Sequence, residues 1–392
     1  MYLRLLYIHR NLTRNLLRTL LTCAAVALPV VIYVLTTSVV HQIDKFLDNS
    51  VKQLRLVVTN KTSVVNPLPQ RYSSQIQSLD PTRRRLWSVC GVVWIGGQVP
   101  DKPLPLSTLA VDHAAFFDTF PEYREALTAE QRAEWMRDRQ AIIIGRATAV
   151  DLGLSVGDRV TILPTLPPYT PMEFHLVSTA PGVEDELTNF CRRDYLEGER
   201  KNARYLTGMI TFFFVKCATR EDLVWADSAI DELFARSPDQ TRTLDEKTFM
   251  SELINQQFNL PRNLRILSAV TIFVAVMAAA NTMSMNFRDR FNEFATLKAI
   301  GFSGWFAWLL ILVESLTLCA IGGTIGAMGP YCAFTYTPLG DLTIPVIQHL
   351  EIDPKVCLWA VLISLGIGLL AGASPAWQAA RMQVVTALRK LE

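Results

Sequence analysis

Four long runs of apolar residues dominate the pattern along the chain. They cover residues 20–40, 266–285, 305–328 and 356–373, and Glu314 is the one charged residue inside them. An α-helix rises about 1.5 Å per residue, so about 20 such residues cross a hydrocarbon core of roughly 30 Å. The pattern therefore predicts four transmembrane helices. A cleaved signal peptide is the alternative for residues 20–40, but that run exceeds the usual apolar core of such a peptide.

Residues 41–262, between the first and second runs, have a different pattern. Segments rich in β-branched and aromatic residues predict strands at 54–60, 92–96, 106–111, 141–144, 159–163, 173–179 and 208–217. Helices are expected at 128–137, 147–152 and 220–236, and stalk helices are expected at both ends of the segment, the second over 247–260. The expected fold is an α-helical membrane protein with four transmembrane helices plus an α+β extracytoplasmic domain inserted between helices 1 and 2.

Basic residues flank the apolar runs unevenly. Residues 1–19 are expected to form an amphipathic helix and contain four Arg and no acid, and the segments 287–304 and 374–392 are also basic. The loop 329–355 contains three acids and one Lys. By the positive-inside rule, both termini and the 287–304 loop are cytoplasmic, whereas 41–262 and 329–355 lie outside. We expect a multi-pass protein of the cytoplasmic (inner) membrane, in contact with membrane lipids.

Composition agrees with a membrane protein and excludes some functions. Half of the 392 residues are hydrophobic and 19% are charged, below the roughly 25% that is usual in soluble domains. The net charge of +2 gives no sign of nucleic-acid binding. Three cysteines, Cys90, Cys191 and Cys217, fall in the expected external segment, and either one disulfide or three free thiols would fit their spacing.

Motifs for catalysis or cofactor binding are missing from the sequence. It contains no GxxxxGK[ST] phosphate loop, no HExxH and no CxxC, so we expect no catalytic residue, metal ligand or cofactor on this chain. Residues 153–157 match GxSxG, but a helix is expected before this motif and a strand after it. The nucleophile elbow needs the opposite order, so a structural turn is expected.

Polar and small residues within the apolar runs carry two further expectations. A carboxylate in a membrane is costly and often functional. For Glu314 we favour a hydrogen bond inside the helix bundle, with Asn281 or Ser315 as candidate partners. The spaced glycines predict close helix packing and are Gly322, Gly326, Gly368 and Gly372.

The loop between the second and third runs reads RDRFNEFATLKAIG over Arg288–Gly301. Helical spacing places Phe291, Phe294 and Lys298 on one face, and Gly301 suits a left-handed helix cap. We expect a short helix that docks a cytoplasmic partner. An amphipathic loop lying on lipid is the alternative.

Three segments together resemble a known family. Residues 293–301 (E-x-ATLKAIG) look like the coupling-helix signature of the FtsX/MacB-like ABC transporter permeases. Residues 374–381 with 387–389 are similar to the C-terminal end of that family, and residues 147–160 resemble its external core domain. The resemblance implies that ATPase-coupling residues are Arg288, Phe291, Glu293, Phe294, Ala295, Leu297, Lys298 and Gly301.

The resemblance also implies partners and a function. The chain would be a stand-alone permease subunit with a MacB-like core domain, acting with a second permease chain in a homodimer or heterodimer. A separate cytoplasmic ABC ATPase dimer would hold ATP and magnesium, and a periplasmic adaptor protein is a further candidate partner. Movement of the external domain would drive export or extraction of a lipid, lipoprotein, peptide or hydrophobic small molecule.

Two other functions stay open at this stage. The chain could be a mechanotransmission scaffold that activates an extracytoplasmic cell-wall hydrolase, although such members usually have a smaller external domain. A membrane-tethered enzyme would rest on the GxSxG match alone.

Overall fold

The structure is a computed structural model that describes residues 16–100, 102–183, 185–200, 203–258, 260–337 and 350–382. It divides into two compact units. The helical unit comprises Met1–Ile43, Asn259–Leu342 and His349–Glu392, and the sheet unit comprises Asp44–Phe258 and Thr343–Gln348. Most of the amphipathic helix expected at 1–19 lies outside the described residues.

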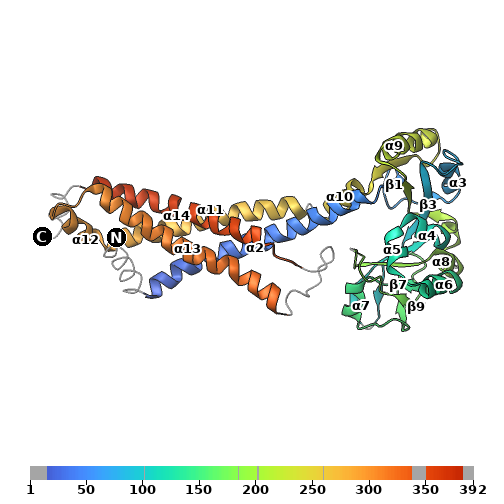
Figure 1. Ribbon diagram of the computed structural model, residues 1–392, viewed down its shortest axis with the longest axis horizontal. Helices are drawn as coiled ribbons and strands as arrows, with labels where there is room; N and C mark the ends of the chain where they lie inside the picture. Colours follow the sequence, from blue (N-terminus) through green and yellow to red (C-terminus); the bar gives the residue numbers. More distant parts are fainter. Residues whose placement is uncertain are drawn as a thin grey trace. The chain divides into compact units, whose positions relative to one another are not determined.

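Four long helices build the helical unit (Figure 1). They are α2 (Leu16–Lys52), α11 (Leu260–Asp289), α13 (Gly304–Tyr336) and α14 (Pro354–Arg381). In the described part of the chain, these four are long and apolar enough to cross a membrane. The expected fold class is confirmed. The helices extend beyond the apolar runs, however. Residues 329–336 continue α13 rather than belonging to a loop, and residues 374–381 continue α14 rather than belonging to a tail.

A short helix, α12 (Phe291–Ala299), lies between α11 and α13. The four long helices share an apolar core in which small and β-branched residues allow close approach. Val26 and Val30 of α2 pack there with Ala279 of α11, Ala327 of α13 and Ala360 of α14.

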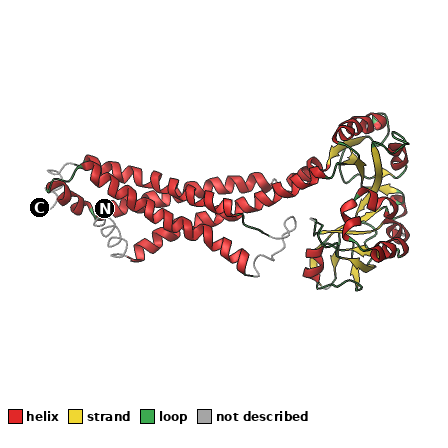
Figure 2. Ribbon diagram, in the orientation of Figure 1, coloured by secondary structure: helices red, strands yellow, loops and turns green. Residues whose placement is uncertain are grey.

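The sheet unit contains a nine-stranded mixed sheet, counted over the described residues (Figure 2). The strand order is β13-β1-β12-β3-β6-β10-β7-β9-β8. The pairs β6–β10 and β7–β9 are parallel, and the other pairs are antiparallel. The strands of this sheet are β1 (Arg55–Asn60), β3 (Leu86–Trp94), β6 (Ser107–Val111), β7 (Ala141–Ile143), β8 (Arg159–Ile162), β9 (Met172–Ser178), β10 (Thr188–Arg192), β12 (Phe212–Cys217) and β13 (Thr241–Asp245).

Helices cover both faces of the sheet because successive side chains of a strand point to opposite faces. On β12, Phe213 belongs to one core cluster and Phe214 to the other. The first cluster includes residues of α3 (Tyr72–Gln77), α7 (Arg146–Leu152), α8 (Arg193–Glu199) and α9 (Arg220–Phe234). The second includes residues of α4 (His113–Thr119), α5 (Pro121–Ala126), α6 (Ala129–Arg137) and α10 (Glu246–Phe258).

Smaller elements complete the sheet unit. Two small two-stranded sheets pair β2 (Leu68–Pro69) with β11 (Met209–Ile210) and β4 (Gln98–Val99) with β5 (Lys102–Pro105). A single 3₁₀ turn covers Arg204–Leu206. Each of the seven predicted strand segments overlaps a strand of the structure, although 92–96 covers only the end of β3. The strands β10 and β13 of the large sheet and the short strands β2, β4 and β5 were not predicted.

The GxSxG match is a turn, as predicted. Helix α7 precedes it and β8 follows it. Gly153 adopts a left-handed conformation with φ 68° at the end of α7, and the Ser155 backbone N–H donates to Asp158 Oδ2 over 2.8 Å. This geometry places no nucleophile on a strand-to-helix elbow.

Arg55, at the start of β1, joins the sheet to two helices. Its Nε and Nη2 donate to the Glu246 carboxylate of α10 over 2.8 and 3.0 Å, and its Nη1 donates to Glu122 of α5. All of these groups are largely buried. Burial alone would lower the pKa of Arg55, but Glu246 and Glu122 outweigh this effect and raise it. The guanidinium therefore stays charged and fixes the first turn of α10 against the sheet.

Candidate coupling site

The connection between α11 and α13, residues 290–303, is built around α12 and is called the elbow below. Arg290 separates α11 from α12, and Gly301, just beyond α12, adopts a left-handed conformation with φ 102°. An L-residue with a side chain rarely adopts this conformation, so the expectation of a cap at Gly301 is met. Ser303 then begins α13, where its hydroxyl accepts from the Phe306 backbone N–H over 3.3 Å.

Glu314 forms a buried ion pair with the elbow. Its Oε2 lies 2.7 Å from Arg290 Nη1, and its Oε1 accepts from Asn286 Nδ2 over 2.8 Å. Only 7% of Glu314 and 9% of Arg290 is exposed. The paired charge and the hydrogen bond offset the cost of burying the carboxylate. The expectation that Glu314 is bonded inside the bundle is therefore confirmed.

The two candidate partners of Glu314 were wrong. The Ser315 hydroxyl donates instead to the Gly368 carbonyl over 2.7 Å, which joins α13 to α14. Asn281 is exposed on α11 and has no hydrogen bond among the described residues to Glu314. Asn286 lies five residues further along α11 and supplies the amide. In the sequence, the only feature that pointed to Asn286 as a partner of Glu314 was its position directly before the basic segment 287–304.

Arg290 makes further contacts that tie it to α12. Its Nε donates to Glu293 Oε2 over 3.0 Å, and its guanidinium carbon lies 5.2 Å from the centre of the Phe294 ring. One side chain thus connects α13, through Glu314, to the first turn of α12. Arg290 was absent from the predicted coupling residues.

Phe294 faces the helical unit rather than a partner. It is 1% exposed and packs with Phe287, Ala307, Ile311 and other buried residues of α11, α13 and α14. Ala295 is buried too, and Phe291 and Leu297 are half-buried against the same cluster. The expectation that Phe294 docks in a groove of another chain is therefore wrong, because its own helices already bury it.

Lys298 anchors the other end of α12. Its Nζ donates to the backbone carbonyls of Ala380 and Met382 over 2.8 and 2.9 Å. These carbonyls lie at the C-terminal end of α14, where orphan acceptors and the negative end of the helix dipole favour a cation. A Cβ at Gly304 would lie 2.5 Å from the Ala380 carbonyl oxygen, so α13 also begins in close contact with α14.

The exposed face of the elbow is formed by residues other than Phe294 and Lys298, which face the helical unit. Asn292, Thr296 and Ala299 form one exposed stripe along α12, at intervals of four and three residues. Ile300 is 72% exposed and Phe302 is 46% exposed just beyond the helix. Arg288 is exposed at the end of α11. This surface, Asn292, Thr296, Ala299, Ile300 and Phe302, is called the elbow surface below.

The predicted glycine contacts are present in the bundle. A Cβ at Gly322 or Gly326 would lie 2.8 or 2.6 Å from the carbonyl oxygens of Cys23 and Ala27 on α2. Cβ atoms at Gly368 and Gly372 would lie about as close to α13, at Cys319 and Ser315. Gly323, which was not predicted, leaves room for Ser364 of α14. These glycines let α2 and α14 both pack closely against α13.

Three comparisons place the chain among known proteins. A family model described as FtsX-like permease C-terminal matches residues 265–384. An uncharacterized ABC transporter permease protein of Mycobacterium tuberculosis is 24% identical over 259 residues, covering 64% of this chain and 29% of that protein. The macrolide export ATP-binding/permease protein MacB of Syntrophobacter fumaroxidans is 26% identical over 153 residues, covering 39% of this chain and 21% of that protein.

Among solved structures, the periplasmic region of MacB from Actinobacillus actinomycetemcomitans is similar over 52% of this chain and 93% of that one. The identity is 12% and the TM-score is 0.34. The chain aligns with less than a third of the length of either curated relative. The family match spans the elbow, α13 and α14 together with most of α11. Residues 265–384 thus match the FtsX-like permease family, and over its aligned parts the chain is similar to ABC transporter permeases.

Proposed function

We propose that this chain couples ATP hydrolysis on a separate ABC ATPase dimer to movement of its sheet unit outside the membrane. ATP and magnesium would be held by the ATPase, and a second permease chain would complete the transporter. The cargo would be a lipid, lipoprotein, peptide or hydrophobic small molecule. In this arrangement both termini and the elbow are cytoplasmic, in the inner membrane.

The elbow is the observation that supports this proposal. It is short and braced at both ends, by Arg290 on Glu314 and by Lys298 on the end of α14. An isolated helix of nine residues would be marginal in water, so these contacts and the burial of Phe294 keep α12 in place. A force applied to α12 would therefore pass to α13 and α14 without first bending the helix.

The elbow surface is the proposed ATPase contact, in place of Phe294. Ile300 and Phe302 are apolar and exposed, which suits anchors of a protein interface. Replacing either with Asp should weaken ATPase binding by about 2 kcal/mol, or roughly thirtyfold. Lys298 and Glu293 would act by holding the orientation of the elbow.

The test combines co-purification with hydrolysis measured in nanodiscs. Ile300→Asp and Phe302→Asp should each reduce recovery of the ATPase and abolish the response of its hydrolysis rate to the permease. Val224→Asp is the matched control, because Val224 is 66% exposed on α9 of the sheet unit. Full ATPase recovery and unchanged hydrolysis in both elbow variants would refute the proposed contact. Hydrolysis by a preparation free of any ATPase subunit would refute the assignment of ATP to the partner.

A further inference from the structure

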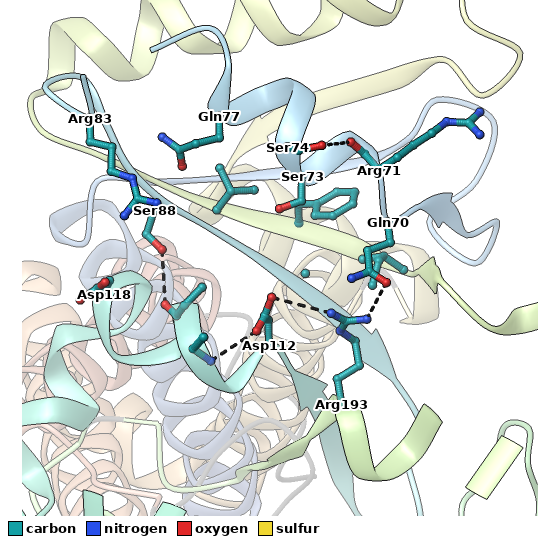
Figure 3. Close-up of a pocket in the computed structure, with 16 residues that line it drawn as sticks. Gln70, Arg71, Ser73, Ser74, Gln77, Arg83, Ser88, Asp112, Asp118 and Arg193 are labelled. Atoms are coloured by element: carbon teal, nitrogen blue, oxygen red, sulfur yellow. Dashed lines mark hydrogen bonds and ion pairs between the residues drawn. The ribbon is translucent and has the colours of Figure 1, made fainter. Parts of the chain in front are cut away.

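A pocket of about 800 Å³ lies in the sheet unit (Figure 3). Its walls come from α3 and the loop before β3, from α4, and from the start of α8. Val89, Ile210 and Phe213 supply an apolar lining. Ligand pockets of this size combine such apolar walls with a few fixed polar groups.

Arg193 is the fixed polar group of this pocket. It is the first residue of α8, and its side chain is 11% exposed. The guanidinium donates to Gln70 Oε1 over 3.1 Å and lies 3.7 Å from Asp112 Oδ2, and Figure 3 shows it between these two side chains. Its Nε has no hydrogen-bond partner in the described structure. Glu197 Oε1 of the same helix lies 4.0 Å from Arg193 Nη1. Arg193 is thus held in position with donor capacity remaining at Nε.

Two more arginines, Arg71 and Arg83, line the pocket with exposed side chains. Neither forms an ion pair with a described carboxylate. The two acids of the lining already face arginines, because Asp112 lies beside Arg193 and Asp118 pairs with Arg124 outside the pocket. The charge left over in the pocket is therefore positive.

Arg83 occupies its place in an unusual backbone conformation. Its φ is 52°, which a residue with a side chain rarely adopts. Asp80 holds the loop in this shape, since its Oδ2 accepts from the backbone N–H groups of Arg85 and Leu86 over 2.6 and 3.0 Å. Such conformations are concentrated at functional sites, and this one lies in the wall of the pocket.

We propose that this pocket binds a phosphate group carried by an amphiphile. Guanidinium groups match phosphate oxygens in geometry and charge. Arg83 and Arg193 approach the pocket from two different segments, and Arg71 adds positive charge at the rim, where its side chain points outward (Figure 3). Ser73 adds a hydroxyl from α3. The carbon atoms next to the phosphate would contact Val89, which is 7% exposed, above the fully buried Ile210 and Phe213. This site goes beyond the proposed coupling function, and its occupation requires no ATPase.

The experiment measures binding to the full chain in nanodiscs of neutral phosphatidylcholine. The probes are dihexanoyl phosphatidic acid below its micelle concentration, glycerol 3-phosphate and inorganic phosphate, each read by thermophoresis with empty nanodiscs as the blank. Arg71→Gln/Arg83→Gln should weaken binding of the phosphatidic acid at least tenfold. Ala114→Trp should abolish binding by filling the pocket, because Ala114 lines it with an exposed side chain.

The matched control is Arg137→Gln/Arg220→Gln, which removes two exposed arginines outside the pocket and should leave binding unchanged. Circular dichroism confirms that each variant is folded. Binding of phosphatidic acid alone would identify a lipid head group as the ligand, and equal binding of inorganic phosphate would identify free phosphate. Failure of every probe to bind, or equal binding by wild type, the double arginine variant and Ala114→Trp, would overturn the proposal.

Discussion

The carboxylate of Glu314 shows how a charge is accommodated between apolar helices. Arg290 reaches it from the end of α11 and Asn286 supplies an amide. Removing one member of a buried ion pair leaves the other charge uncompensated, which typically costs more than replacing both members with apolar residues.

We therefore expect Glu314→Leu and Arg290→Met each to lower the free energy of unfolding by about 3 kcal/mol. The double variant should lose less than the sum of the two single losses, since neither charge then remains buried. Denaturant unfolding in detergent measures this double-mutant cycle. Additive losses would mean that the two side chains do not interact in the folded protein.

Asp80 carries a pH-dependent contribution to stability. Hydrogen bonds from the Thr82 hydroxyl and from the backbone N–H groups of Arg85 and Leu86 lower its pKa to about 2. A carboxyl with a pKa below its unfolded value of about 3.9 stabilises the fold fully above that value, and the contribution is lost as pH falls toward the folded pKa.

Asp80→Asn should accordingly lower the melting temperature of the full chain at pH 6. The gap from wild type should close between pH 4 and pH 2, as wild-type Asp80 becomes protonated. Asp151→Asn is the control, because Asp151 is exposed on α7 and its removal should have little effect at any pH. A gap that stays constant through this window would contradict the role given to the Asp80 carboxylate.

Phe294 and Glu314 also show where sequence reasoning stops at the residue scale. Helical spacing correctly placed Phe291, Phe294 and Lys298 on one side of α12. The sequence does not say whether that side meets the chain's own helices or another protein. The choice depends on Ile311 and Ala379, which lie far along the chain and reach Phe294 only in the folded bundle.

At the scale of elements, the glycines of α13 set how closely the neighbouring helices approach. Gly326→Ala should destabilise the bundle by about 1–3 kcal/mol, because its Cβ would meet backbone and side-chain atoms of α2 that are already in contact. Gly366→Ala in α14 is the matched control, since nothing lies within 4 Å of its Cβ.

Alanine is also the better helix former, by up to about 1 kcal/mol, so Gly366→Ala should be neutral or stabilising. Thermal unfolding in the same detergent separates the two variants. Equal melting temperatures for Gly326→Ala and Gly366→Ala would show that α2 does not pack on this face of α13.

The elements most easily predicted are those whose composition alone determines them. The four spanning helices follow from the length of their apolar runs, which is greater than a helix of a soluble domain needs. The strand β10 was missed because Thr188–Arg192 reads TNFCR and leads directly into charged residues. It forms because β6 and β7 pair with it on either side, and the two core clusters bury Phe190 and Cys191 on opposite faces of the sheet. Tertiary contacts, rather than local propensity, specify it.

At the scale of the whole molecule, the proposed topology predicts which residues a reagent outside the cell can reach. A cysteine introduced near Pro103 of the sheet unit should react in intact cells with a maleimide that cannot cross membranes. One introduced at Asn292 of the elbow surface should react only after the cells are opened. The background should be Cys332→Ser, because Cys332 is exposed on α13. Reaction at Asn292 from outside would invert the proposed orientation.

The pocket could not be predicted from the sequence for a reason that belongs to this scale. Arg193 lies more than 100 residues after Arg71 and Arg83, and no local spacing connects it with them. The sheet brings these segments together, because β6 pairs with both β3 and β10, and α8 begins directly after β10.

The burial of the sheet-unit cysteines has a consequence for redox chemistry. Cys90, Cys191 and Cys217 are free and fully buried, and burial raises the pKa of Cys90 and of Cys217 to about 12. Because the thiolate is the reactive form, these groups are inert toward oxidants and toward exchange with disulfides. The folded sheet unit can therefore persist under oxidising or reducing conditions, because none of these thiols is exposed to an oxidant or to another disulfide.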